Sequence, residues 1–221
     1  TSIKGAVQIM AAARDQLPPA FGKLLDIADK NCARLATMVN DILDLEKIER
    51  RKMAFDCQQQ SLAPVVRDAV RSIQPYADGY GVRVHCRATG NDATFGCLVD
   101  TGRLTQVMVN LLSNAIKFSP RGNQVDVVLD LAGDRVRFSV ADSGPGIPDE
   151  FRSRIFEKFA QAGQTNARGA SGSGLGLAIC KAIIEHHQGT IGFDSVSGEG
   201  STFYFELPSC FGGIARAEAS A

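Results

Sequence analysis

Three polar side chains near the middle of the sequence share one face of a predicted helix. Asn110, Asn114 and Lys117 are spaced by four and three residues, which places them on the same side of a helix. An amide oxygen is a suitable ligand for Mg²⁺, and a lysine beside it can meet phosphate charge. Asparagines on a helix more often face solvent or cap the helix, so this segment alone is a weak sign of a metal site. The opposite face is apolar and consists of Leu104, Val107, Met108, Leu111, Leu112 and Ala115.

A glycine-rich turn follows a predicted strand and begins at Asp142. Gly144 and Gly146, followed by Ile147, permit a close approach of the backbone to a flat ligand. The carboxylate of Asp142 can accept a hydrogen bond from an exocyclic amine such as the adenine N6 group. The alternative is an ordinary strand-to-helix turn in which Asp142 accepts from its own backbone. Taken alone, the segment favours this ordinary turn.

Two further segments flank a stretch that has no periodicity. Phe156 and Phe159 precede it, and taken alone they are typical core residues. The segment after it opens an apolar helix and contains Gly172, Gly174, Leu175 and Gly176. Glycines before a helix expose N–H groups and the positive end of the helix dipole, which together suit a phosphate. No strand directly precedes this run, no GK[ST] follows it, and the sequence has no HRD or DFG element. These absences exclude a dinucleotide fingerprint, a Walker loop and a Ser/Thr protein kinase.

Together, and in this order, the four segments resemble the N, G1, F and G2 boxes of the histidine kinase ATP-binding domain. That domain belongs to a superfamily shared with Hsp90, gyrase B and MutL. Residues 100–110 are similar to the family's approach to the N box, and residues 198–203 to its last turn and strand. The resemblance covers about residues 53–208, and a helical hairpin before them extends it.

The resemblance implies a mixed sheet backed by three helices, with ATP held between the helices and a lid. It implies that Asn114 binds Mg²⁺, that Asn110 contacts the phosphates or the metal, and that Lys117 meets phosphate oxygens. Asn110 and Lys117 would be the catalytic residues. Asp142 would accept from adenine N6, which favours ATP over GTP. The remaining implied ATP contacts are Phe118 at the adenine, Gly144, Gly146 and Ile147 at the floor, Phe156 and Phe159 at the lid base, Gly172, Gly174, Leu175 and Gly176 over the phosphates, and Thr202 at the adenine edge.

The implied reaction transfers the γ-phosphoryl group of ATP to a histidine and then to an aspartate in the receiver domain of a response regulator. Such transfers depend mainly on positioning and on neutralisation of charge. In the family, the phosphoaccepting histidine lies in the first helix of the hairpin. The three histidines of this sequence, His85, His186 and His187, lie elsewhere. We therefore expect a fragment that binds ATP but does not phosphorylate itself.

Two helices are predicted before the ATP-binding region. Residues 1–16 have helical periodicity, the prolines at 18 and 19 interrupt it, and a longer helix runs from about Phe21 to Lys52. The second helix carries a continuous apolar stripe with heptad-like spacing, which an antiparallel hairpin alone cannot cover. We predict a homodimer in which two hairpins form a four-helix bundle. The alternative is a hairpin that packs on its own downstream domain. The stripe comprises Phe21, Leu24, Leu25, Ala28, Cys32, Leu35, Val39, Ile42, Leu45 and Ile48.

Strand-like and helix-like segments alternate in the rest of the chain. The predicted strands are 82–86, 124–130, 135–141, 190–194 and 201–207, and the predicted helices are 63–76, 101–117, 149–156 and 174–187. With the three helices that the resemblance implies, we predict an α+β chain in which an antiparallel helical hairpin precedes an α/β sandwich. The predicted parts are a truncated dimerisation and phosphoacceptor hairpin (1–53), an ATP-binding catalytic domain (54–210) and a flexible tail (211–221). Residues 161–173 are predicted to form a mobile lid.

Charge and cysteine content argue against several classes of protein. The 24 basic and 24 acidic residues give a formal net charge of zero, which gives no sign of binding to nucleic acid or to an anionic membrane. No apolar run approaches the roughly 20 residues of a membrane helix. The six cysteines include no CxxC pair, which disfavours a zinc site and favours a reducing compartment. We expect a cytoplasmic chain without nucleic-acid or membrane contact.

Two other interpretations remain open at this point. A degenerate kinase could serve as a dimerisation and docking module without phosphotransfer, although the intact boxes favour ATP binding. Another ATPase of the superfamily, such as a chaperone or a DNA-repair enzyme, would place a catalytic glutamate where this chain has Asn110. An asparagine cannot act as a base, so we expect slow hydrolysis.

Overall fold

The computed structural model describes residues 5–6, 9–10, 19–50, 52–161 and 173–210. The chain divides into two compact units, Thr1–Lys52 and Met53–Ala221. The helix predicted at residues 1–16, the predicted lid and the predicted tail at 211–221 lie mostly or wholly outside the described residues.

One long helix, α2 (Pro19–Glu49), dominates the first unit. Proline is tolerated in the first turn of a helix because the N–H groups there have no partner within the helix. The predicted helix from about Phe21 to Lys52 is confirmed, with its end three residues earlier. Much of the apolar stripe is exposed, and the most exposed members are Phe21, Leu24, Leu35, Val39 and Ile42.

A five-stranded mixed sheet forms the centre of the second unit, as predicted. Strand β2 is parallel to β4, and the other neighbouring strands are antiparallel. The order is β2-β4-β5-β7-β6. The strands are β2 (Arg83–Ala88), β4 (Gln124–Ala132), β5 (Arg135–Asp142), β6 (Thr190–Val196) and β7 (Gly200–Pro208).

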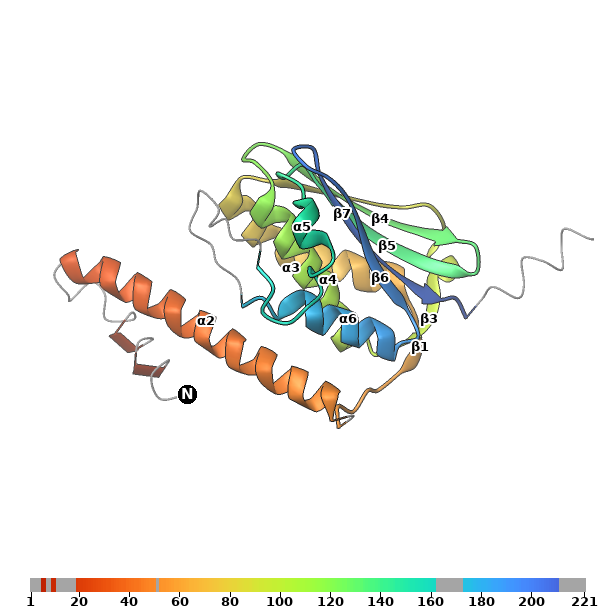
Figure 1. Cartoon of the computed structure of the whole chain (residues 1–221), viewed down its shortest axis with the longest axis horizontal. Coiled ribbons are helices and arrows are strands. Elements are labelled where there is room, and N and C mark those ends of the chain that lie inside the picture. The colour runs from red at the N-terminus through yellow and green to blue at the C-terminus, as the bar shows by residue number, and fades with distance from the viewer. Residues whose placement is uncertain (1–4, 7–8, 11–18, 51, 162–172, 211–221) are drawn as a thin grey trace, which may run out of the picture. The chain divides into compact units, whose positions relative to one another are not determined.

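Alternation along the strands decides which face of the sheet is buried. On β5, Val136, Phe138 and Val140 are buried, and Phe205 and Leu207 on β7 face the same side. Three helices cover this apolar face, with α4 between the other two (Figure 1). They are α3 (Leu62–Tyr80), α4 (Thr101–Phe118) and α6 (Gly176–His186).

Several elements differ from the sequence-based expectations. Strands β1 (Gln58–Ser61) and β3 (Gly96–Val99) form a separate antiparallel pair, and a short 3₁₀ helix, η2 (Asp92–Phe95), precedes β3. The sequence of β1 is polar and has no alternation of apolar residues, so it gives no strand signal. Its pairing with β3 stabilises the strand instead. The helix predicted at 149–156 is confined to α5 (Asp149–Arg152).

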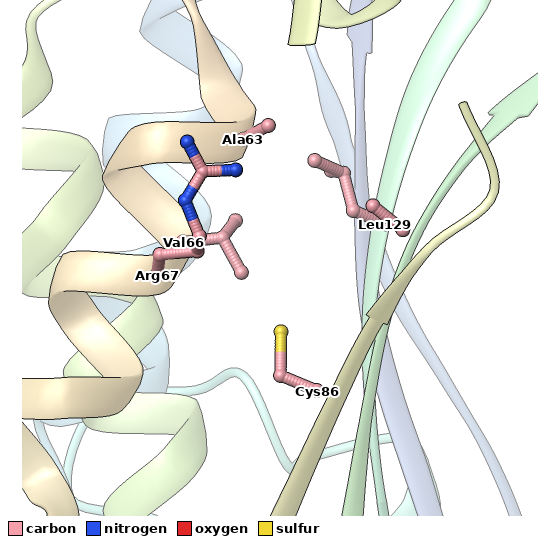
Figure 2. A pocket seen from close by; sticks show the side chains of 6 residues that line it. Ala63, Val66, Arg67, Cys86 and Leu129 are labelled. Carbon is pink, nitrogen blue, oxygen red and sulfur yellow. The ribbon is translucent and has the colours of Figure 1, made fainter. Parts of the chain in front are cut away.

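A cavity of about 230 Å³ lies between α3 and strands β2 and β4. Figure 2 shows the sulfur of Cys86 pointing from its strand into this space, opposite Val66 and Arg67 on the helix. The guanidinium of Arg67 forms two hydrogen bonds with the carboxylate of Asp92, at 2.9 and 2.7 Å. The cavity is lined by none of the residues that the sequence assigns to nucleotide binding.

Among the helices that the structure describes, none combines the length and the hydropathy required of a transmembrane span.

The buried pair of phenylalanines on the sheet gives a test of where the core lies. Phe138 is fully buried, and its ring stacks on that of Phe205 with centroids 5.0 Å apart. We expect Phe138→Ala to lower the free energy of unfolding by about 3–5 kcal/mol, because it removes buried surface and leaves a void. Leu131→Ala on the neighbouring strand is the control, since Leu131 is 45% exposed. Urea denaturation of both variants measures the difference, and equal losses would contradict this assignment of the core.

Candidate functional site

Helix α4 carries the first set of candidate residues because its other face is needed for the core. The apolar face predicted from the sequence is buried, which leaves Asn110, Asn114 and Lys117 half-buried on the remaining side. The side-chain nitrogen of Asn114 donates to the side-chain oxygen of Asn110 at 3.0 Å. The amide oxygen of Asn114 is therefore the atom available for a hard cation such as Mg²⁺.

Lys117 and Phe118 are the last two residues of α4, and Lys117 lies on its polar face. The ammonium of Lys117 lies 5.2 Å from the ring centroid of Phe118. Phe118 is 41% exposed, so it offers an apolar surface to a flat ligand. The cationic end of Lys117 and this ring provide the two chemistries that a nucleotide requires, one for phosphate and one for a base.

Asp142 is the last residue of β5 and faces the helices, because it continues the alternation of Phe138 and Val140. The N–H of Gly144 donates to its carboxylate at 2.8 Å. Burial raises the pKa of Asp142 to about 6, although hydrogen bonds from the N–H groups of Gly144 and Ser201 oppose the increase. The site therefore holds a partly desolvated carboxylate that remains mostly ionised at neutral pH.

Gly144 allows the turn after β5 to approach the end of α4. A Cβ at Gly144 would lie 2.7 Å from Oδ1 of Asp142 and 3.0 Å from the carbonyl oxygen of Phe118. Gly146 has φ 70° and abuts the carbonyl of Val196 at the end of β6. Glycine at both positions brings the turn into contact with the two elements that flank it.

Ile147 is buried, and its N–H donates to Oγ of Ser195 at 2.9 Å. The hydroxyl of Ser195 also lies 3.0 Å from that of Ser201. These bonds attach the glycine-rich turn to β6 and β7.

The register of β7 places Ser201, rather than Thr202, beside Asp142. Asp142 pairs with Ser201, whereas Thr202 pairs with Ala141 on the opposite face of the sheet. The structure therefore places Ser201 next to this carboxylate, and the role of Thr202 at the adenine edge stays a prediction. The signal was present in the sequence, because Ser201 shares the parity of the buried Phe205 and Leu207.

The segments on either side of residues 162–172 meet at Phe159. A Cβ at Gly174 would lie 2.9 Å from Cα of Phe159, whose φ is 61° and whose side chain is 66% exposed. The ring of Phe156 lies 6.1 Å from that of Phe193 on β6. The structure thus brings Gly174 to Phe159 and Phe156 to β6, whereas Gly172 lies outside the described residues.

Gly176 begins α6 directly against Asn110. A Cβ at Gly176 would lie 2.9 Å from Oδ1 of Asn110, so a larger residue would displace that side chain. Leu175 before it is buried and anchors the start of the helix. The unpaired N–H groups of the first turn of α6 therefore lie beside the polar face of α4, which suits an anion.

The residues present fit a nucleotide with Mg²⁺. A buried carboxylate can accept from a base amine, a lysine and a helix N-terminus can neutralise phosphate, and an amide oxygen can ligate the metal. The close contacts at Gly144 and Gly176 bring the elements that carry these groups next to one another.

Two family models match the sequence. The model described as "Histidine kinase-, DNA gyrase B-, and HSP90-like ATPase" matches residues 99–210, slightly more than half of the chain. The model described as "His Kinase A (phospho-acceptor) domain" matches residues 1–51.

Relatives with similar sequences include sensory and sensor histidine kinase proteins. The sensory/regulatory protein RpfC of Xanthomonas campestris pv. campestris is 33% identical over 219 residues, which cover 95% of this chain and 29% of that protein. The sensor histidine kinase AruS of Pseudomonas aeruginosa is 37% identical over 183 residues, which cover 78% of this chain and 18% of that protein. The chain thus spans less than a third of the length of these relatives.

Solved structures share the fold. Full-length ShkA in complex with AMPPNP has a TM-score of 0.74 and 28% identity, covering 94% of this chain and 43% of that one. Histidine kinase ThkA in complex with the response regulator protein TrrA has a TM-score of 0.67 and 25% identity, covering 94% and 57% respectively. From these matches and the site geometry, the chain belongs to the histidine kinase-, DNA gyrase B- and HSP90-like ATPase family and, within it, to the sensor histidine kinases.

Proposed function

We propose that the second unit binds ATP with Mg²⁺ and serves as the catalytic part of a two-component sensor histidine kinase. The observation that carries the proposal is the contact between Gly176 and Asn110, because it places the N-terminus of α6 against the polar face of α4, on which Asn110 is bonded to Asn114. Asp142 adds a desolvated acceptor for the adenine amine. The AMPPNP complex of ShkA supports nucleotide binding by this fold.

Each residue has a separate task in this proposal. Asp142 selects adenine over guanine, because its carboxylate accepts a hydrogen bond and cannot donate one. Gly144 and Gly146 shape the floor, and Phe118 packs against the base. Lys117 and the first N–H groups of α6 hold phosphate oxygens in place, and Asn110 orients the amide of Asn114. ATP supplies the phosphoryl group, and Mg²⁺ neutralises its charge when bound.

Asn110 favours transfer to an acceptor over hydrolysis. An amide has no basic lone pair that could activate water, so the site lacks a general base at this position. Positioning and electrostatics are then the main contributions of the protein, as in other phosphoryl transfers.

We propose that none of the three histidines in this sequence is the phosphoryl acceptor. His85 is exposed on β2, where its Nδ1 lies 3.4 Å from the carboxylate of Asp126. The ring of His186 stacks on Phe55. Both nitrogens of the buried His187 are engaged with backbone groups.

We further propose a homodimer through the first unit, a receiver domain as the downstream partner, and a cytoplasmic location. The exposed apolar stripe of α2, within the match to a phospho-acceptor domain, supports the dimer. The complex of ThkA with its response regulator protein supports the receiver. The need for ATP, which is plentiful in the cytoplasm, supports the location. On this proposal, residues 1–53 are the dimerisation domain and residues 54–210 are the catalytic domain.

Asp142→Asn should separate recognition from stability. We expect about a tenfold or greater loss of ATP affinity at pH 8, because a hydrogen bond to a charged acceptor is lost. The folded-state pKa of Asp142 is about 6 against an ordinary 3.8, so its favourable contribution to stability is complete below about pH 4 and is lost as the pH rises through 6. The substitution should therefore raise stability at pH 8, by up to about 3 kcal/mol, and give no gain at pH 4.

Calorimetric ATP binding and urea denaturation at the two pH values measure these effects. Asp134→Asn, at the exposed hairpin turn, is the control. In the unsubstituted chain, ATP affinity should fall as the pH is lowered through about 6. Unchanged affinity in Asp142→Asn would contradict the placement of adenine at this carboxylate. A complete lack of binding by the unsubstituted chain would favour a docking module.

Asn114→Ala should remove the effect of Mg²⁺ on nucleotide binding. We expect the increase in AMPPNP affinity on adding Mg²⁺ to disappear, because the ligating amide oxygen is lost. Thr105→Ala is the control, since its hydroxyl donates to the carbonyl of Thr101 on the same helix. Calorimetry with Mg²⁺ and with EDTA provides the measurement, and a Mg²⁺ effect of unchanged size would place the metal elsewhere.

Leu35→Glu should convert the dimer to a monomer. Leu35 is 59% exposed on α2, and a carboxylate in a buried helix interface is strongly unfavourable. Thr37→Glu adds the same charge to the opposite side of the helix and should leave the dimer intact. Analytical ultracentrifugation of residues 1–221 distinguishes the two states, and a monomeric unsubstituted chain would refute the proposed dimer.

A further inference from the structure

Three contacts between α4 and α6, counting the residues that cap them, share one antiparallel register. Gly176 lies against Asn110, the thiol of Cys180 donates to the carbonyl of Val107 at 3.9 Å, and Nε2 of His187 accepts from the N–H of Asp100 at 3.0 Å. As the residue numbers increase along α6, the numbers of the contacting residues on α4 decrease. The first contact belongs to the nucleotide site, and the third lies at the far end of both helices.

His187 forms the far contact only as a neutral imidazole of one tautomer. Its Nδ1 lies 2.8 Å from the carbonyl oxygen of Ile183, so Nδ1 carries the proton and donates there. Nε2 is then the acceptor for the N–H of Asp100. The ring is buried, and its protonation would turn this acceptor into a donor that faces another donor.

This bond and the nucleotide site lie at opposite ends of α6. The 11 residues of α6 span roughly 16 Å at about 1.5 Å per residue, and continuous backbone hydrogen bonding along the helix links its two ends. A sliding or tilting of its C-terminal end therefore moves Gly176 against Asn110. The His187–Asp100 bond resists this movement from the end that does not touch the ligand.

The segment that enters this unit after α2, residues 53–57 (the connector), contacts the same far end. The N–H of Asp56 donates to Oδ2 of Asp100 at 3.1 Å, while Oδ1 of Asp100 accepts from the N–H of Arg103 and caps α4. The ring of Phe55 stacks on His186 with centroids 3.6 Å apart and meets His187 edge-on at 5.4 Å. The connector thus touches the beginning of α4 and the end of α6 together.

We infer that His187 is a positioning residue of the nucleotide site, and that Phe55 and Asp56 couple the connector to that site through the ends of α4 and α6. The inference rests on the proposed ATP binding. Because coupling between two sites is reciprocal, nucleotide binding stabilises the docked connector, and a docked connector raises nucleotide affinity.

The charged and titratable groups around His187 come from three elements. His186 lies on its own helix, Asp100 begins α4, and Asp56 and Cys57 belong to the connector. Burial lowers the pKa of His187, and the neighbouring His186 lowers it further, whereas the carbonyl of Ile183 and the charge of Asp100 oppose this. The imidazole is therefore neutral at physiological pH and becomes protonated only in acid.

Three variants of the full chain separate positioning from general stability. His187→Leu removes the acceptor and should weaken AMPPNP binding by about tenfold, the usual size for one buried hydrogen bond. His187→Gln retains an acceptor of similar reach and should restore affinity to within about threefold. Ile183→Val removes one methyl group from the buried face of α6, lowers stability, and should leave affinity unchanged.

The pH profile gives a second readout that a purely structural role would not move. Asp142 and its pH dependence are common to the unsubstituted chain and His187→Gln, so the ratio of their affinities isolates His187. This ratio should shift in favour of His187→Gln as the pH is lowered into the acid range, because only histidine is protonated there. A ratio that is constant with pH would overturn the positioning role.

Amide hydrogen exchange at Asp56 tests the coupling to the connector. Saturating AMPPNP should slow this exchange in the unsubstituted chain and have no such effect in His187→Leu, and Phe55→Ala should weaken AMPPNP binding. The coupling is wrong, although the proposed function stands, if the unsubstituted chain binds AMPPNP, the exchange rate at Asp56 does not change on binding, and Phe55→Ala binds AMPPNP with the same affinity. If the unsubstituted chain does not bind AMPPNP, the proposed function and this inference fail together.

Discussion

The nucleotide site depends on the close approach of α6 to α4 at Gly176. The backbone there occupies the space beside Asn110, where a Cβ would lie 2.9 Å from the amide oxygen. A methyl group there would displace the side chain of Asn110 from its place beside the start of α6, whose first N–H groups suit a phosphate. The buried apolar faces of both helices hold them on the sheet, and the missing side chain at Gly176 leaves room for Asn110 beside the start of α6.

Asp142 shows how the sheet contributes an acceptor at the margin of the core. Its place at the end of β5 follows from the same alternation that buries Phe138, so the fold itself directs a carboxylate inward. Burial makes ionisation unfavourable, and the N–H groups of Gly144 and Ser201 offset only part of that cost. A neutral side chain would suit the fold better, so stability alone does not explain an acidic residue here.

The parts that could be predicted from the sequence are those with local signals. Periodicity located α4, β4 and β5, and helical spacing correctly grouped Asn110, Asn114 and Lys117. Strand β1 could not be found this way, because partners far along the chain rather than its own residues define it. Thr202 was assigned by resemblance alone, whereas the parity of β7 selects Ser201. The contact of His187 with Asp100 joins residues 87 apart in sequence and has no local signal.

The same long-range contacts explain how a movement of the connector could change the phosphate-binding end of α6 without a direct contact between them. Side chains in a packed site have little freedom to respond one by one, whereas two rigid helices can shift relative to each other. Asp100 caps α4, accepts from the connector and donates to His187, so three elements share one residue. Displacement of the connector would remove the hydrogen bond of Asp56 from the start of α4 and the stacked ring of Phe55 from the end of α6. The geometry at Gly176 would then respond, because the far end of the same rigid helix has lost its restraint.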